Sequence, residues 1–174
     1  IAHQAGDIKD RPFGTDAVEQ GQLLIRPNAS IGIAQIKPSE LKYYAPDLVG
    51  NEQALFDPDT AARVMSAKMS YADGLLQSDS LFKDIGTTDR YMLLAIAQNC
   101  DNPDSMKRIF YTFVARGGNW EEMLADRPGW TGQLRSVALH IEWLLANGYE
   151  LPEGLDMQYW KETAFSNIEG VDYE

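Results

Sequence analysis

The residues TDRYMLLAIAQN at positions 88–99 form a strongly apolar stretch of the chain. Every side chain from Met92 to Ala97 is apolar, so a helix here carries apolar groups on nearly all its sides. Such a helix is normally buried in the middle of a domain, because each side needs a covering neighbour. We therefore predict a central buried helix over 88–99.

Further helices are predicted on the C-terminal side of this stretch. One begins at Asn102-Pro103 and stops at Gly117-Gly118, and a short helix follows Asn119. The longest amphipathic stretch covers about 131–147 and ends before Gly148. Its inward face is predicted to consist of Leu134, Val137, Ala138, Ile141, Leu144 and Leu145. The tail, 152–174, is expected to dock through Tyr159, Trp160 and Phe165.

On the N-terminal side, Asp57 is suited to cap a helix with Pro58 at its first position. The apolar stripe of that helix is predicted to be Ala62, Met65, Met69, Ala72 and Leu76. The β-branched segment 30–36 predicts one short strand, with Ile31, Ile33 and Gln35 on one face. Residues 5–29 are polar and are read as a long loop with a short helix near 16–24.

Length and composition favour one compact domain over 1–174. The apolar fraction of 44% is enough for a single core, and no repeat or linker divides the chain. Several helices around one short β element predict an α+β, mostly α-helical class. The start Ile1-Ala2-His3-Gln4 resembles the last turn of a helix, so we expect an apolar helical segment before Ile1.

The charge balance argues against several classes of ligand. A net charge of −11 repels a phosphate backbone, and no basic stripe offsets it, so nucleic acid is excluded as a partner. No apolar run reaches the roughly 20 residues that span a bilayer. His3 and His140 lack any ligand-type spacing, so no metal and no cofactor is expected.

Three segments, in this order, resemble the lytic transglycosylases and goose-type lysozymes. The first, SIGIAQIKP at 30–38, is similar to the family's small-x-Gly-x-x-Gln-Ile-x-Pro segment. The second, LFDP at 55–58, is similar to its Leu-x-x-Pro helix entry. The third, LAIAQN at 94–99, is similar to its Leu-Ala-x-Ala-Tyr-Asn segment. The resemblance covers about 30–100 and implies a lysozyme-like fold with the short β element beside the buried central helix.

The resemblance also implies a site. Ser30, Gly32 and Gln35 would line the glycan groove, and Asn99 would orient the substrate or the surroundings of the catalytic acid. The match departs from the family at Gln98, where an aromatic residue is usual. A second departure is Cys100-Asp101, where a small residue and glycine are usual. These departures predict a different groove wall beside Asn99.

The family's catalytic acid is a glutamate at the end of an apolar helix, where an apolar pocket keeps it protonated. Two positions compete for it here. Glu19 stands thirteen residues before Gly32, but too little helix precedes it to bury a carboxyl group. Gln4 ends the apolar turn 1–3, and we favour it as the equivalent position. Because glutamine has no titratable proton, a chain with Gln4 at this position is inactive.

The resemblance implies a muramidase or lytic transglycosylase acting on peptidoglycan or a related aminosugar glycan, outside the cell or in its envelope. Such an enzyme needs only one carboxyl group, because the sugar's own hydroxyl closes onto the anomeric carbon. Two alternatives stay open. One is a non-catalytic glycan-binding or regulatory domain with the same fold, and the other is a helical protein-interaction module.

Overall fold

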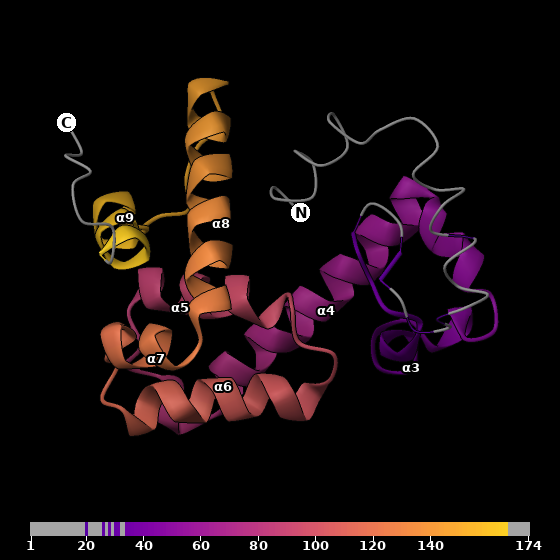
Figure 1. The fold of residues 1–174 in the computed structure, drawn as a ribbon, viewed down its shortest axis with the longest axis horizontal. Coiled ribbons are helices and arrows are strands. Elements are labelled where there is room, and N and C mark those ends of the chain that lie inside the picture. Colours follow the sequence, from indigo (N-terminus) through magenta and orange to yellow (C-terminus); the bar gives the residue numbers. More distant parts are fainter. Residues whose placement is uncertain (1–19, 21–25, 27, 29, 32–33, 167–174) are drawn as a thin grey trace.

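The computed structural model of the protein describes residues 20, 26, 28, 30–31 and 34–166. In this part of the chain nearly all regular structure is helical, which confirms the mostly α-helical class (Figure 1). Within residues 34–166 the α-helices are α3 (Leu41–Tyr44), α4 (Pro58–Ser78), α5 (Thr87–Ala97), α6 (Pro103–Ala115), α7 (Trp120–Asp126), α8 (Pro128–Ala146) and α9 (Met157–Phe165). The same range contains four 3-10 turns: Pro38–Glu40, Pro46–Leu48, Glu52–Phe56 and Ser80–Phe82.

Helix α5 is central, as its sequence predicts. It contacts α4, α6, α8 and α9, and its residues Met92, Leu93 and Ile96 are completely buried. The Thr88 hydroxyl accepts a hydrogen bond from the Asp156 backbone N–H at 2.7 Å, which fixes the approach to α9. The prediction of a buried central helix is therefore confirmed.

Capping residues start the helices where the sequence indicates. The Asp57 carboxylate accepts from the Thr60 N–H before α4, and the Asn102 side chain accepts from the Ser105 N–H before α6. Both satisfy an N–H that has no partner within the helix. Helix α6 ends at Ala115, and Gly117 and Gly118 follow it with φ angles of 63° and 77°, which suit glycine.

The buried face of α4 is rotated from the predicted one. Ala62 is exposed and Met69 is only half-buried, so the predicted stripe is wrong at these positions. The buried residues are Ala61, Val64, Met65, Lys68, Ala72 and Leu76. Apolar residues at 61, 62, 64, 65 and 69 fit two neighbouring faces of the helix. The face that contains Lys68 is the buried one, because the Lys68 side chain has a buried partner.

The described residues of 30–36 do not continue as the predicted strand. Ile31 and Ile36 pair with each other in one isolated antiparallel bridge, with N···O distances of 3.0 and 3.1 Å. Ala34 and Gln35 form a turn, and Gln35 takes a φ of 49° in the left-handed region. The predicted strand placed Ile31 and Gln35 on one face. In the structure Ile31 and Ile36 are both buried, whereas Gln35 is exposed.

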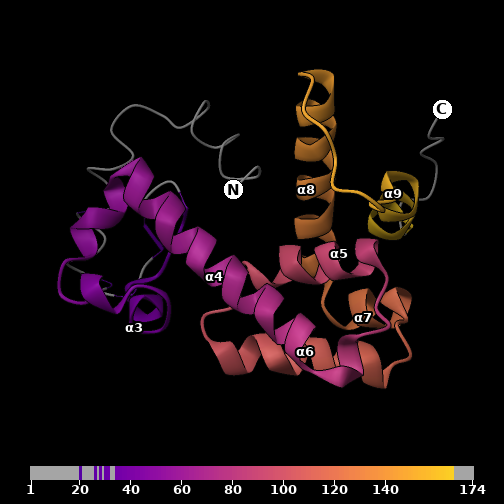
Figure 2. The ribbon, with the colours of Figure 1, turned by 180° about the vertical axis from the view of Figure 1, so that it is seen from behind.

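Helices α8 and α9 close the domain at its C-terminal side. Trp160 is 1% exposed, and its indole N–H donates to the Leu134 carbonyl at 3.0 Å. The C-terminal half of α8 extends away from the other helices (Figures 1 and 2). Leu145 is exposed there, so its predicted inward position is wrong: α5 and α9 cover only the first part of the helix. No described helix is long and apolar enough to cross a membrane.

Candidate functional site

The predicted site residues divide into two groups. Gln4, Glu19 and Gly32 lie outside the residues that the structure describes. Ser30 is half-buried, and both Gln35 and Asn99 are exposed. The site is therefore built from the described segment after Ser30 and from the end of α5.

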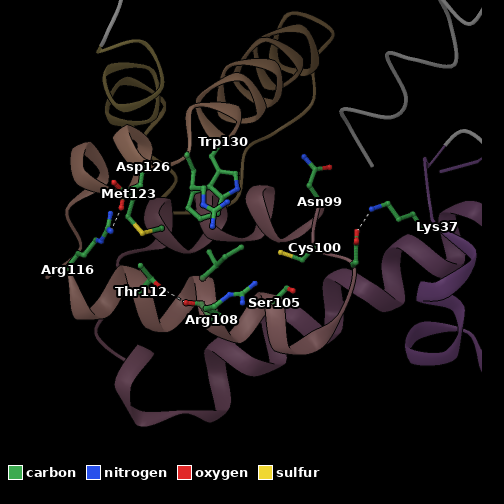
Figure 3. Close-up of a pocket in the computed structure, with 13 residues that line it drawn as sticks. Lys37, Asn99, Cys100, Ser105, Arg108, Thr112, Arg116, Met123, Asp126 and Trp130 are labelled. Carbon is green, nitrogen blue, oxygen red and sulfur yellow. Dashed lines mark hydrogen bonds and ion pairs between the residues drawn. The ribbon is translucent and has the colours of Figure 1, made fainter. Parts of the chain in front are cut away.

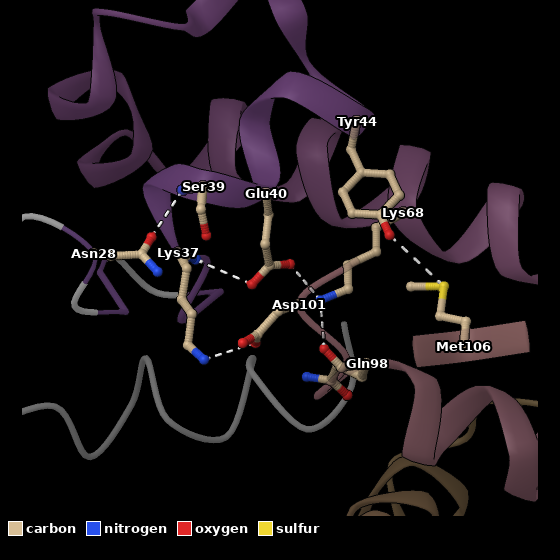
Figure 4. Close-up of polar contacts among 9 residues, drawn as sticks. All are labelled: Asn28, Lys37, Ser39, Glu40, Tyr44, Lys68, Gln98, Asp101 and Met106. Carbon is tan, nitrogen blue, oxygen red and sulfur yellow. Dashed lines mark hydrogen bonds and ion pairs between the residues drawn. The ribbon is translucent and has the colours of Figure 1, made fainter. Parts of the chain in front are cut away.

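A buried ion pair joins three distant parts of the chain (Figure 4). The Lys68 ammonium group on α4 pairs with the Glu40 carboxylate and donates to the Gln98 carbonyl at 2.7 Å. The other Glu40 oxygen accepts from the Lys37 N–H at 3.2 Å. Only 3% of the Lys68 side chain and 4% of the Glu40 side chain are exposed. Two of the three segments that carry the family resemblance contribute backbone groups to this cluster: 30–38 through the Lys37 N–H and 94–99 through the Gln98 carbonyl.

A second ion pair lies at the edge of the same cluster. The Lys37 ammonium group contacts the Asp101 carboxylate at 2.6 Å, and both side chains are partly exposed. This contact fixes the chain after the 31–36 turn against the connection between α5 and α6 (Figure 4). Lys37, Asn99 and Asp101 consequently reach the same surface.

That surface is hollowed into a cleft of about 430 Å³ (Figure 3). Its described walls come from Lys37, from the α5–α6 connection, from α6 and from the α7–α8 corner. The lining residues are Lys37, Asn99, Cys100, Asp101, Ser105, Arg108, Ile109, Thr112, Arg116, Met123, Asp126, Arg127 and Trp130. Its volume lies within the usual range of small-ligand pockets, roughly 300–1,000 Å³.

Asn99 stands at one end of the cleft. Its amide N–H donates to the Gln133 side chain at 2.8 Å, which orients the group from α8. Its amide oxygen makes no hydrogen bond with another described residue and is available to a ligand. Gln35 does not line this cleft, so a groove-lining role for Gln35 and Ser30 stays a prediction.

Sequence reasoning assigned no role to Lys68, Glu40, Arg108 and Arg127. A signal for Lys68 was present, because a lysine at 68 interrupts the apolar spacing 61, 64, 65, 72. A charge on the buried face of a helix requires a buried partner. Arg108 and Arg127 carry no such local signal, since they line one cleft only through the packing of α6 with the α7–α8 corner. Among the described residues no cluster of three histidine, cysteine or acidic side chains could hold a metal ion.

The Cys100 thiol at the cleft base is predicted to react slowly. Burial raises its pKa to about 11, although Lys68 and Arg108 lower it in part. The thiol therefore stays protonated near neutral pH, and the thiolate is the reactive form. A disulfide-exchange reagent should label native Cys100 much more slowly than the unfolded chain, with a rate that rises as pH approaches 11. Equal labelling rates for the folded and unfolded chain at neutral pH would contradict this.

Comparison of the chain with protein-family models, with curated proteins and with solved structures gives no match.

Proposed function

We propose that this chain is a lysozyme-like domain that binds the aminosugar strands of peptidoglycan in the cleft beside Asn99, outside the cell or in its envelope. One observation carries the proposal. The segments 30–38 and 94–99, which resemble parts of glycan-cleaving enzymes, both contact the Glu40–Lys68 pair, and each contributes a lining residue, Lys37 and Asn99, to the cleft.

The chemistry of the cleft suits a sugar chain. Asn99 offers an amide oxygen, and Ser105 adds a hydroxyl group on the α6 wall. The half-buried Trp130 presents an aromatic side chain at the α8 corner. Sugar ligands need both kinds of contact, because their hydroxyl groups form hydrogen bonds and their C–H faces are apolar.

Binding without cleavage fits the residues better than catalysis. A general acid must deliver a proton, but both carboxylates among the described lining residues are held in ion pairs: Asp101 with Lys37, and Asp126 with Arg116. Gln4, at the position we assign to the family's acid, has no proton to transfer. We therefore infer that this chain retains the glycan groove and has lost the cleavage step.

Titration with soluble peptidoglycan strands tests the proposal. We expect saturable binding, weakened about 2–10-fold by Asn99→Ala through loss of one hydrogen bond. Asn147→Ala is the matched control, because Asn147 is also exposed but lies at the far end of α8. Melting curves establish that both variants fold. Absence of binding by the unaltered chain would overturn the proposal and favour a helical interaction module.

A further inference from the structure

The cleft is basic in a strongly acidic protein. Four basic and two acidic residues are found among its described lining residues, whereas the chain as a whole carries a net charge of −11. The two acidic side chains are already paired, Asp101 with Lys37 and Asp126 with Arg116. The charges left over are the guanidinium groups of Arg108 and Arg127.

Pairing is the rule for the other arginines within 34–166. Arg63 pairs with Asp47, and Arg90 with Asp73. Arg116 pairs with Asp126, and Arg135 donates to the Ala164 carbonyl. The guanidinium groups of Arg108 and Arg127 make no hydrogen bond or ion pair with any residue in this range. Both residues are exposed and line the cleft, so their guanidinium groups are available to an acidic ligand.

The two arginines line the cleft from different elements. Arg108 belongs to α6, while Arg127 precedes α8 and lies three residues before Trp130. Figure 3 shows Arg108 and Ser105 on the α6 wall, with Trp130 across from them and Asn99 toward one end. A guanidinium group presents a planar fork of donors that matches a carboxylate. A ligand extending from Asn99 along this cleft thus meets two carboxylate-binding groups.

We propose that Arg108 and Arg127 bind the carboxylates that distinguish peptidoglycan from a neutral aminosugar strand. These carboxylates belong to the lactyl groups or to the peptide stems of its muramic acid units. The inference rests on the proposed function and adds ligand specificity to the same cleft. The Asn99 end holds the sugar backbone, and the two arginines hold the acidic substituent.

Three soluble probes separate the sources of charge. Intact strands carry peptide stems, strands treated with an amidase keep only the lactyl carboxylate, and chitin oligosaccharides carry no carboxylate. We expect at least one acidic strand to bind about tenfold more tightly than chitin, as one charge-assisted hydrogen bond allows. Arg108→Gln and Arg127→Gln should each reduce that preference, measured as the ratio of acidic-strand affinity to chitin affinity. Lys107→Gln is the matched control, because Lys107 is exposed on α6 and does not line the cleft.

The outcomes are distinguishable. A preference for acidic strands that Arg108→Gln removes and Lys107→Gln retains supports the inference, and the preferred strand identifies the carboxylate. Equal affinity for all three probes, or a preference unchanged by both arginine variants, overturns the inference and leaves the proposed function intact. Failure of all three probes to bind overturns the proposed function and this inference together.

Discussion

Replacing Lys68 with methionine is expected to lower the free energy of unfolding by about 3–5 kcal/mol, the usual cost of breaking a buried ion pair by removing one partner. The methionine side chain fills most of the same space, but it leaves the Glu40 carboxylate buried and facing no cation. It also removes the donor to the Gln98 carbonyl. Denaturant unfolding of the variant and the unaltered chain measures the difference.

Lys161→Met provides the control for this prediction. The Lys161–Glu142 pair has a similar contact of 2.6 Å, but both side chains are more than a third exposed. Its loss should cost less than about 1 kcal/mol, because water solvates the remaining carboxylate. The double variant Glu40→Leu with Lys68→Met should recover part of the stability lost in Lys68→Met, since no buried charge remains. If Lys68→Met lowers the free energy of unfolding no more than Lys161→Met does, the Glu40–Lys68 pair does not hold together the parts of the chain at Glu40, Lys68 and Gln98.

Gln4→Glu is expected to raise peptidoglycan lysis by about 10²–10⁴-fold, the range that one positioned proton donor commonly supplies. The prediction follows from assigning position 4 to the family's acid, with the glycan groove still able to bind its strand. Glu19→Gln should leave lysis unchanged. Turbidity of a suspension of purified cell walls, with release of soluble fragments, measures both variants.

The two candidate positions give opposite outcomes. If Glu19→Gln abolishes a lysis that the unaltered chain already shows, Glu19 is the acid and the inference of an inactive chain is wrong. If Gln4→Glu binds strands but does not cleave them, position 4 is not equivalent to the family's glutamate. Gln4→Ala is the matched control, because it changes the same position without adding a carboxyl group.

Local signals predicted the helices of this chain well. The Asp57 and Asn102 side chains start helices by accepting a hydrogen bond from the backbone N–H three residues later. Such a cap can be recognised from four consecutive residues of the sequence. The burial of α5 was also predictable, because a helix apolar on all sides needs covering neighbours.

Tertiary contacts decided what the sequence left open. Lys68 is buried because Glu40, 28 residues earlier, meets it, and no local pattern reveals that partner. Ile31 and Ile36 pair with each other because the chain turns at Gln35, a left-handed conformation that is uncommon for glutamine. The basic cleft depends on how α6 and the α7–α8 corner pack together, so Arg108 and Arg127 have no neighbouring residues that mark them as a site.

The central claim, that the 30–38 and 94–99 segments border a glycan-binding cleft, is tested most directly by mapping where a strand binds. Backbone amide chemical shifts would be followed while soluble peptidoglycan strands are added to the folded chain. We expect the shifts to cluster at Lys37, Asn99 and Ser105, with the exposed half of α8 around Trp143 unchanged. Shifts confined to Trp143 and its neighbours, with none at Lys37 or Asn99, would contradict the claim.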